Sequence, residues 1–137
     1  MANVIITVGD LRFAARFEES AAPRTCAAFR RLMPFEHRLV QARWSGEAAW
    51  VPLGDLWLDI PVENATGKPA RGELLFYPGG VSETELLFPY GTARFACRDG
   101  PLQGNHFLSL TSGLDLLHEL GRRVLWEGAQ TIRIAAG

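Results

Sequence analysis

The 137-residue sequence has only two cysteines, three histidines and a formal net charge of −1. Cys26 and Cys97 are far apart and form no C-x-x-C pair, which favours free thiols in a reducing cytoplasm over a disulfide framework. Cys26 lies in a helical apolar pattern, so we expect it to pack in the core. The near-zero charge provides no broad positive field, and we expect no nucleic-acid partner.

Long hydrophobic runs are also absent. The apolar segment at the N-terminus stops at Gly9-Asp10, and no basic residues precede it. Such a segment is too short for a signal peptide or a membrane span, so we expect a cytoplasmic protein with no membrane partner. The chain is 47% hydrophobic and 21% charged, which is enough to bury a core, and we expect one domain over residues 1–137.

Short apolar runs separated by glycine, proline, asparagine and aspartate make up most of the chain. Residues 4–8 and 11–17 flank Gly9-Asp10 as the strands of a hairpin do. We expect helices from Pro23 to Pro34 and over 112–123, and strands within 38–44, 48–53, 72–78, 83–90, 93–97, 105–110 and 129–137. Many short strands with turns between them predict a mainly β barrel or sandwich.

Residues 72–88, GELLFYPGGVSETELLF, contain a Gly-x5-Pro-x-Gly spacing that precedes a metal-binding histidine in cupin barrels. Glu83 stands at the ligand position here, and the three histidines lie in separate segments, whereas a catalytic metal site needs converging ligands. We therefore expect neither a metal nor a cofactor. The simpler interpretation is two antiparallel strands joined by Pro78-Gly79-Gly80. Glu83 and Glu85 are interpreted as solvated edge residues in preference to an acid–base pair.

The order of strands and helices resembles that of cyclophilins. Residues 22–32, APRTCAAFRRL, are similar to the first cyclophilin helix, and residues 114–137 are similar to the last helix and strand. Residues 95–111, FACRDGPLQGNHFLSLT, share a Gly-Pro pair, a second glycine and a following phenylalanine with a cyclophilin segment. The resemblance implies a single closed β-barrel of about eight antiparallel strands with two short helices.

Three segments more narrowly resemble a bacterial family of small cyclophilin-like proteins of unknown function: residues 42–56, 61–69 and 72–80. For isomerase activity, Arg38 is the nearest match to the cyclophilin arginine, and His106 stands in place of the glutamine. The apolar floor segment and the W-L-D-G-K-H segment have no counterpart, although a proline site needs its apolar floor and its arginine together. Prolyl isomerisation is therefore the alternative function, and the catalytic residues stay unknown.

The preferred ligand-binding candidates lie in residues 42–52, ARWSGEAAWVP. Arg43, Trp44, Glu47 and Trp50 place two large aromatics and two charges close together, a combination that is common where small ligands bind. The alternative is that both tryptophans fill the core while Arg43 and Glu47 form a surface ion pair.

Further candidates come from three other segments. Glu63 and Asn64 are polar residues on a long loop, although a turn-forming asparagine is the alternative. Tyr77 is a candidate to cover the apolar part of a ligand. The resemblance places Arg94, Asn105 and His106 beside the ligand face, where His106 could equally be a structural hydrogen-bonding residue.

We expect a cleft between residues 42–50 and 94–107, lined by Arg43, Trp44, Arg94 and His106, in which an arginine holds an anion. The sequence shows no nucleophile–base arrangement, so whether the protein is an enzyme stays open. The favoured function is binding of a small molecule or a short peptide in a cleft at the rim of the barrel. An anionic small molecule is one of the alternatives. The further alternatives are a non-catalytic interaction or assembly subunit and self-association into a homo-oligomer.

Overall fold

The computed structural model describes residues 4–137, and it begins with the hairpin predicted around Gly9-Asp10. Strand β1 (Val4–Val8) pairs antiparallel with β2 (Leu11–Phe17). Gly9 turns the chain with a φ of 59°, a conformation that glycine adopts without steric cost. Alternate side chains of both strands are buried, as a sheet with one covered face requires. The predicted bounds of both strands are confirmed.

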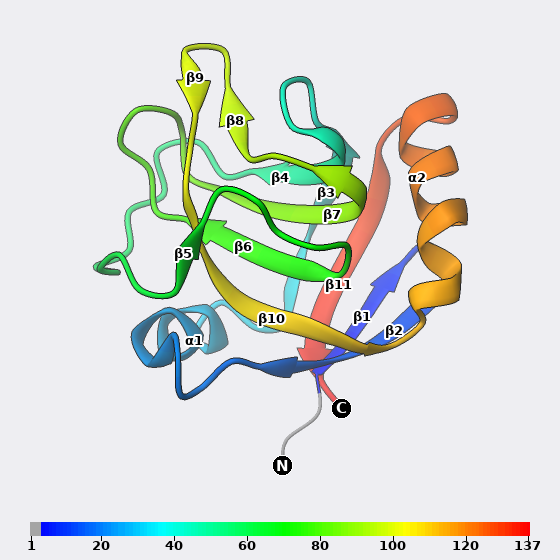
Figure 1. The fold of residues 1–137 in the computed structure, drawn as a ribbon. Helices are drawn as coiled ribbons and strands as arrows, with labels where there is room; N and C mark the ends of the chain where they lie inside the picture. Colours follow the sequence, from blue (N-terminus) through cyan, green and yellow to red (C-terminus); the bar gives the residue numbers. More distant parts are fainter. Residues whose placement is uncertain (1–3) are drawn as a thin grey trace.

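Eight antiparallel strands close into a barrel (Figure 1). Their order around the barrel is β2, β1, β11, β3, β4, β7, β6 and β10, and β10 pairs with β2 to complete the ring. The six strands that follow the first hairpin are β3 (Phe35–Gln41), β4 (Gly46–Pro52), β6 (Glu73–Tyr77), β7 (Glu85–Ala93), β10 (Gly104–Ser112) and β11 (Gln130–Ala136). The prediction of a mainly β closed barrel with about eight antiparallel strands and two short helices is confirmed.

Two helices contribute side chains to the core from opposite sides of the barrel (Figure 1). Helix α1 (Pro23–Arg30) packs against β10, and it ends at Arg30, so the prediction that it reaches Pro34 is wrong. A short 3-10 helix (Leu114–Leu116) leads into α2 (Leu117–Trp126), which packs on β7, β3 and β4. Neither helix of the described residues has the length and apolarity needed to cross a membrane.

The barrel core is rich in phenylalanine. Phe29 of α1 packs against Phe35 and Phe107, with ring centroids 5.0 and 4.9 Å apart. Cys26 is fully buried in the same cluster, and this confirms its predicted packing role. Offset and edge-on contacts between such rings stabilise a core beyond their burial alone.

A second, smaller core lies on the outer face of the barrel. Residues 94–103 leave the wall and form a hairpin from β8 (Ala96–Cys97) and β9 (Gly100–Pro101), which projects beside β4 and β7 (Figure 1). Phe95 anchors this segment against Tyr77, with ring centroids 5.5 Å apart. Phe95 and Leu102 consequently cover outward side chains of β4, β6 and β7, among them Ala48, Leu75 and Leu87. β5 (Ala65–Thr66) pairs with the start of β10.

The stretch with cupin-like spacing forms a hairpin, as its simpler interpretation predicts. β6 and β7 pair antiparallel, with Leu75 opposite Leu87 and Tyr77 opposite Glu85. Gly79 and Gly80 have φ values of 94° and 133°, which other residues rarely adopt. The turn therefore accounts for both glycines without a metal.

Candidate functional site

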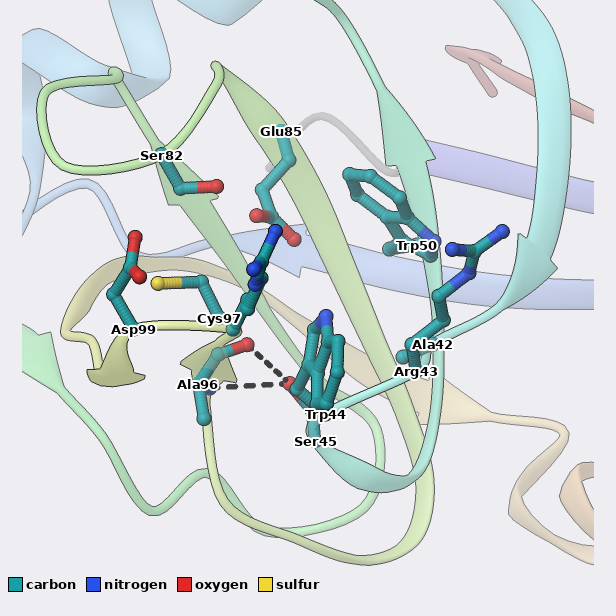
Figure 2. A pocket seen from close by; sticks show the side chains of 11 residues that line it. Ala42, Arg43, Trp44, Ser45, Trp50, Ser82, Glu85, Ala96, Cys97 and Asp99 are labelled. Atoms are coloured by element: carbon teal, nitrogen blue, oxygen red, sulfur yellow. Dashed lines mark hydrogen bonds between the residues drawn. The ribbon is translucent and has the colours of Figure 1, made fainter.

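A cleft of about 140 Å³ separates the turn between β3 and β4 from the β8–β9 hairpin (Figure 2). We call it the hairpin cleft, and it lies between the two segments for which the sequence predicts a cleft. It is lined by Ala42, Arg43, Trp44, Ser45, Trp50, Ser82, Glu85, Ala96, Cys97, Arg98 and Asp99.

Ser45 joins the two walls of the cleft, the β3–β4 turn and the β8–β9 hairpin, through hydrogen bonds. Its buried hydroxyl donates to the Ala96 carbonyl at 3.2 Å and accepts from the Ala96 N–H at 3.1 Å (Figure 2). The Arg94 N–H donates to the Ser45 carbonyl at 3.1 Å. Gly46 follows with a φ of 83°, which lets the chain turn directly into β4. These bonds fix the backbone that carries Arg43 and Trp44.

Neither tryptophan of this segment lies in the barrel core. The Trp44 side chain is 55% exposed, and Trp50 is half-buried on the outer face against the smaller core. Arg43 is exposed and makes no ion pair with a residue of the described chain. Glu47 instead accepts a hydrogen bond from the Thr92 N–H at 2.8 Å, outside the hairpin cleft. The alternative of core tryptophans with an Arg43–Glu47 pair is therefore wrong.

Glu85 places a carboxyl group inside the cleft, with its oxygens directed toward the centre (Figure 2). The residue is only 6% exposed, so its interpretation as a solvated edge residue is wrong. The reason is the β8–β9 hairpin, which covers the outer face on which Glu85 and Leu87 lie. Burial, and secondarily the negative charge of Glu83, raises the pKa of the Glu85 carboxyl to about 8.

Within residues 4–137, the Glu85 carboxyl has no hydrogen-bond or ion-pair partner. The nearest polar groups on its own hairpin make other bonds: the Thr84 hydroxyl donates to the Leu56 carbonyl at 2.6 Å, and the Tyr77 hydroxyl accepts from the Val81 N–H at 3.0 Å. Arg98 and Asp99, in the turn between β8 and β9, supply exposed charges at the rim of the cleft. The cleft thus combines aromatic walls, exposed guanidinium groups and one buried carboxyl.

A larger hollow of about 760 Å³ adjoins the cleft on the other side of the hairpin. Trp44 and Ala96 line both spaces. Arg94, predicted for the cleft itself, lies in this adjoining hollow with Lys68. These two cations are its only charged lining residues, so the adjoining hollow favours negatively charged groups.

Glu63 and Asn105 belong to a separate hydrogen-bond network, which attaches the long loop between β4 and β5 to α1. The Glu63 carboxylate accepts from the Thr25 N–H at 2.6 Å and from the Thr25 hydroxyl at 2.7 Å. The buried Asn105 amide donates to the same hydroxyl at 3.0 Å and to the Pro61 carbonyl at 2.8 Å. Both side chains therefore hold the loop in place, away from the hairpin cleft.

Asn64 and His106 also lie outside the hairpin cleft. Asn64 has a φ of 49°, as in its turn-forming interpretation, and its amide donates to the His106 carbonyl at 2.9 Å. His106 Nε2 lies 2.7 Å from the Ser109 hydroxyl, which donates to the Glu18 carboxylate at 2.5 Å. The Ser109 hydroxyl therefore bridges the imidazole and the Glu18 carboxylate, and none of these three residues lines the hairpin cleft.

The residues matched to the cyclophilin catalytic positions are not brought together. Arg38 lies on β3 and His106 on β10, which are four strands apart in either direction around the barrel. Arg38 is exposed and donates to the Ala129 carbonyl at 3.4 Å.

Tyr77 does not line the hairpin cleft, because its ring packs against Phe95. In the part of the chain that the structure describes, no His, Cys, Asp and Glu side chains cluster to hold a metal ion.

The sequence-based candidates do not include Ser82, Glu85, Cys97 or Asp99, although all of these polar side chains line the cleft. A signal for Glu85 was present, because Leu87 follows it on the same face of β7 and Leu75 lies opposite Leu87. Apolar side chains on an outward face indicate that something covers it.

Comparison with known proteins gives a family and a fold. The chain matches the family described as "Protein of unknown function (DUF3830)" over residues 4–136. No curated protein matches it. Among solved structures, one described as "Structure of McbB in complex with tryptophan" superposes with a TM-score of 0.73 at 17% sequence identity. The match covers 96% of this chain and 44% of that chain, so the similarity is in the fold of less than half of the larger protein.

Proposed function

We propose that this chain, which belongs to the DUF3830 family, binds a small molecule in the hairpin cleft. The apolar part of the ligand packs against Trp44 and Trp50, and an anionic group pairs with Arg43 or Arg98 at the rim. The finer assignment to the cyclophilin-like superfamily, a cytoplasmic location and a bacterial source are part of the same proposal, and they rest on the resemblance of the sequence.

The observation that carries the proposal is the position of Trp44. Its indole is 55% exposed and lies between two hollows, while Ser45 beside it is buried and fixed to the hairpin. Tryptophan is the largest apolar side chain, and an exposed indole beside a concave surface is typical of binding sites. Arg43, exposed and without an ion-pair partner in residues 4–137, supplies the neighbouring charge.

The adjoining hollow extends the choice of ligands. A molecule too long for the 140 Å³ cleft can pass Trp44 and place an acidic end beside Lys68 and Arg94. This supports a short peptide or a molecule with an anionic tail as well as a compact ligand. The similar structure described as a complex with tryptophan supports including amino acids among the compounds to be tested, although its identity of 17% supports the fold alone.

Thermal shift measurements against a panel of metabolites, with amino acids and aromatic carboxylates included, test the proposal. A specific ligand should raise the melting temperature in proportion to its saturation. Arg43→Ala should weaken binding of an anionic ligand by about 1.5–3 kcal/mol, the value of a charge-assisted hydrogen bond. Trp44→Ala should weaken every ligand of the cleft.

Matched controls are available elsewhere on the surface. Arg31→Ala removes an exposed arginine after α1, and Trp126→Ala removes an indole that is 78% exposed on α2. Both variants should bind as the wild type does. If no compound shifts the melting temperature, or if the control variants lose binding as much as the cleft variants, the hairpin cleft is not the binding site.

A second candidate is a non-catalytic assembly subunit, which is favoured by Trp57 and Trp126, 73% and 78% exposed. Exposed aromatics of this size are typical of protein contacts, including those of a homo-oligomer. Light scattering across a wide concentration range distinguishes this function, because assembly through these residues should be lost in Trp57→Ala and Trp126→Ala while ligand binding is kept.

A further inference from the structure

We propose that Glu85 binds the ammonium group of the ligand, which makes the ligand of the hairpin cleft an aromatic primary amine. This rests on the proposed function of the cleft and names the class of molecule that it accepts. The cleft then uses its buried carboxyl for the cation, its tryptophans for the aromatic body and its rim arginines for any anionic group.

The geometry of Glu85 gives the first argument. The residue is 94% buried, since only 6% is exposed, and its carboxyl is directed into the cleft between Ser82 and Trp50 (Figure 2). It has no partner within residues 4–137, whereas the neighbouring Thr84 hydroxyl donates to a backbone carbonyl. No side-chain oxygen that is itself buried lacks a hydrogen-bond partner in residues 4–137, so the Glu85 oxygens reach the open space of the cleft. There they accept from water or from a donor group of a ligand.

The charges around Glu85 give the second argument. The titratable and charged groups that line the cleft with it or adjoin it on β6 and β7 are Glu83, Tyr77, Arg43, Cys97, Arg98 and Asp99. Neither arginine lies within 4.0 Å of the carboxylate, and both are exposed. The buried end of the cleft is therefore acidic, and its rim carries the two arginines together with Asp99. A molecule with an ammonium group at its inner end matches this order of charges.

The walls of the cleft give the third argument. Trp44 and Trp50 line the space next to the carboxyl, with Ala42 and Ala96 as small apolar neighbours. An ammonium group gains from indole faces as well as from a carboxylate, and an aromatic body attached to it stacks on the same rings. A neutral alcohol of the same size would gain from the apolar contacts but would bring no charge to the carboxyl.

Binding of an ammonium group changes the protonation of Glu85. With its pKa at about 8, the free carboxyl carries a proton at pH 7. An adjacent cation favours the ionised form of a carboxyl group. When the ammonium group binds, the Glu85 carboxyl therefore loses its proton to solvent, and the resulting carboxylate pairs with the ammonium group. The ammonium keeps its three protons, and about one proton per ligand is released.

Isothermal titration calorimetry of the full chain with three matched compounds tests this inference. L-Phenylalanine carries the amine and the carboxylate, phenethylamine lacks the carboxylate, and 3-phenylpropionate lacks the amine. Titration at pH 7 in two buffers of different ionisation enthalpy measures the protons released. We expect the two amines to bind about 10-fold or more tightly than 3-phenylpropionate, with release of about one proton per ligand.

Variants of Glu85 assign the effect to one group. Glu85→Gln keeps the shape of the protonated side chain, so it should fold, and it should lose both the preference for amines and the proton release. Glu85→Asp should keep the proton release at reduced affinity. Glu83→Gln is the matched control outside the cleft lining and should keep the preference for amines.

The outcomes separate this inference from the proposed function. If 3-phenylpropionate binds as tightly as L-phenylalanine, or if Glu85→Gln keeps the preference, the pairing of Glu85 with an amine is overturned while binding in the cleft stands. If none of the three compounds binds, the aromatic amine is overturned as the ligand class. In that case, the metabolite panel with Arg43→Ala and Trp44→Ala still decides whether the cleft binds anything.

Discussion

Substitution of Glu85 by glutamine should stabilise the protein at neutral pH and leave it unchanged in mild acid. The unfolded chain ionises Glu85 with an ordinary pKa of 4.5, whereas burial raises the pKa in the folded protein to about 8. Between these values the unfolded state binds fewer protons than the folded state, so the free energy of unfolding falls as the pH rises. Glutamine does not titrate and removes this loss.

The magnitude follows from the pKa difference. Each pH unit above 4.5 costs the wild type about 1.4 kcal/mol until the folded carboxyl ionises as well. The loss at pH 7 is therefore about 3 kcal/mol, and below pH 4.5 it is absent because both states are protonated. This is a large part of the total stability of a small domain.

Urea denaturation of wild type and Glu85→Gln in a series of buffers from about pH 5 to pH 8.5 measures the difference. The contributions of the histidines and other carboxylates cancel when the two proteins are compared at each pH. Glu83→Gln is the control, because Glu83 is exposed and should change stability little. A constant difference between wild type and Glu85→Gln across this range would refute the assignment of a raised pKa to Glu85.

Three further predictions concern the packing, the metal and the alternative activity. Gly121→Ala should lower the free energy of unfolding by about 1–3 kcal/mol in urea denaturation, because the added methyl group would overlap the ring of Tyr90. Chelation with EDTA should leave the melting temperature unchanged; a fall accompanied by stoichiometric metal in elemental analysis would contradict this. A proline-peptide assay should show no isomerisation above the uncatalysed rate, and catalysis that disappears in Arg38→Ala would show otherwise.

The strands could be predicted where apolar runs are bounded by turn residues. The apolar runs on either side of Gly9-Asp10 predict both strands of the first hairpin with their observed bounds. β3 begins at Phe35, whereas the sequence predicts a strand from residue 38. The earlier start gives no apolar signal because Glu36, His37 and Arg38 are exposed polar residues. β5, β8 and β9 consist of two residues each, and so short a pairing leaves no periodic signal in the sequence.

The site could be predicted in part. Arg43, Trp44 and Trp50 are candidates because of their residue types and spacing, and all three line the hairpin cleft. The resemblance to cyclophilins also places Arg94 and His106 beside the ligand, as parts of one segment, residues 94–107. Residues 94–103 instead leave the barrel wall as a hairpin, whereas His106 remains in β10. Sequence periodicity describes each strand but not which outer face a hairpin covers.

The burial of Glu85 is not visible in the sequence for the same reason. A carboxylate near a hairpin turn is usually solvated, and this expectation requires an open outer face. The face is closed by Phe95 and Leu102, which belong to the hairpin segment, residues 94–103, that follows β7. A leucine at position 85 would suit the neighbouring Leu87 and Tyr77, so the fold itself does not require a carboxyl there. The stability that Glu85 costs is thus a reason to look for a ligand that recovers it.

If the ligand is an aromatic amine, its affinity should increase with pH in a manner set by Glu85. Below a pKa of about 8, a proton competes with the ammonium group for the carboxyl, so affinity should rise about 50-fold between pH 6 and pH 8. It should fall again near pH 10, where the amine itself loses its charge. Calorimetry with phenethylamine measures this profile, and 3-phenylpropionate, which has no ammonium group, should not show the rise. An affinity for phenethylamine that is flat from pH 6 to pH 8 would mean that Glu85 is already ionised in the free protein or does not contact the amine.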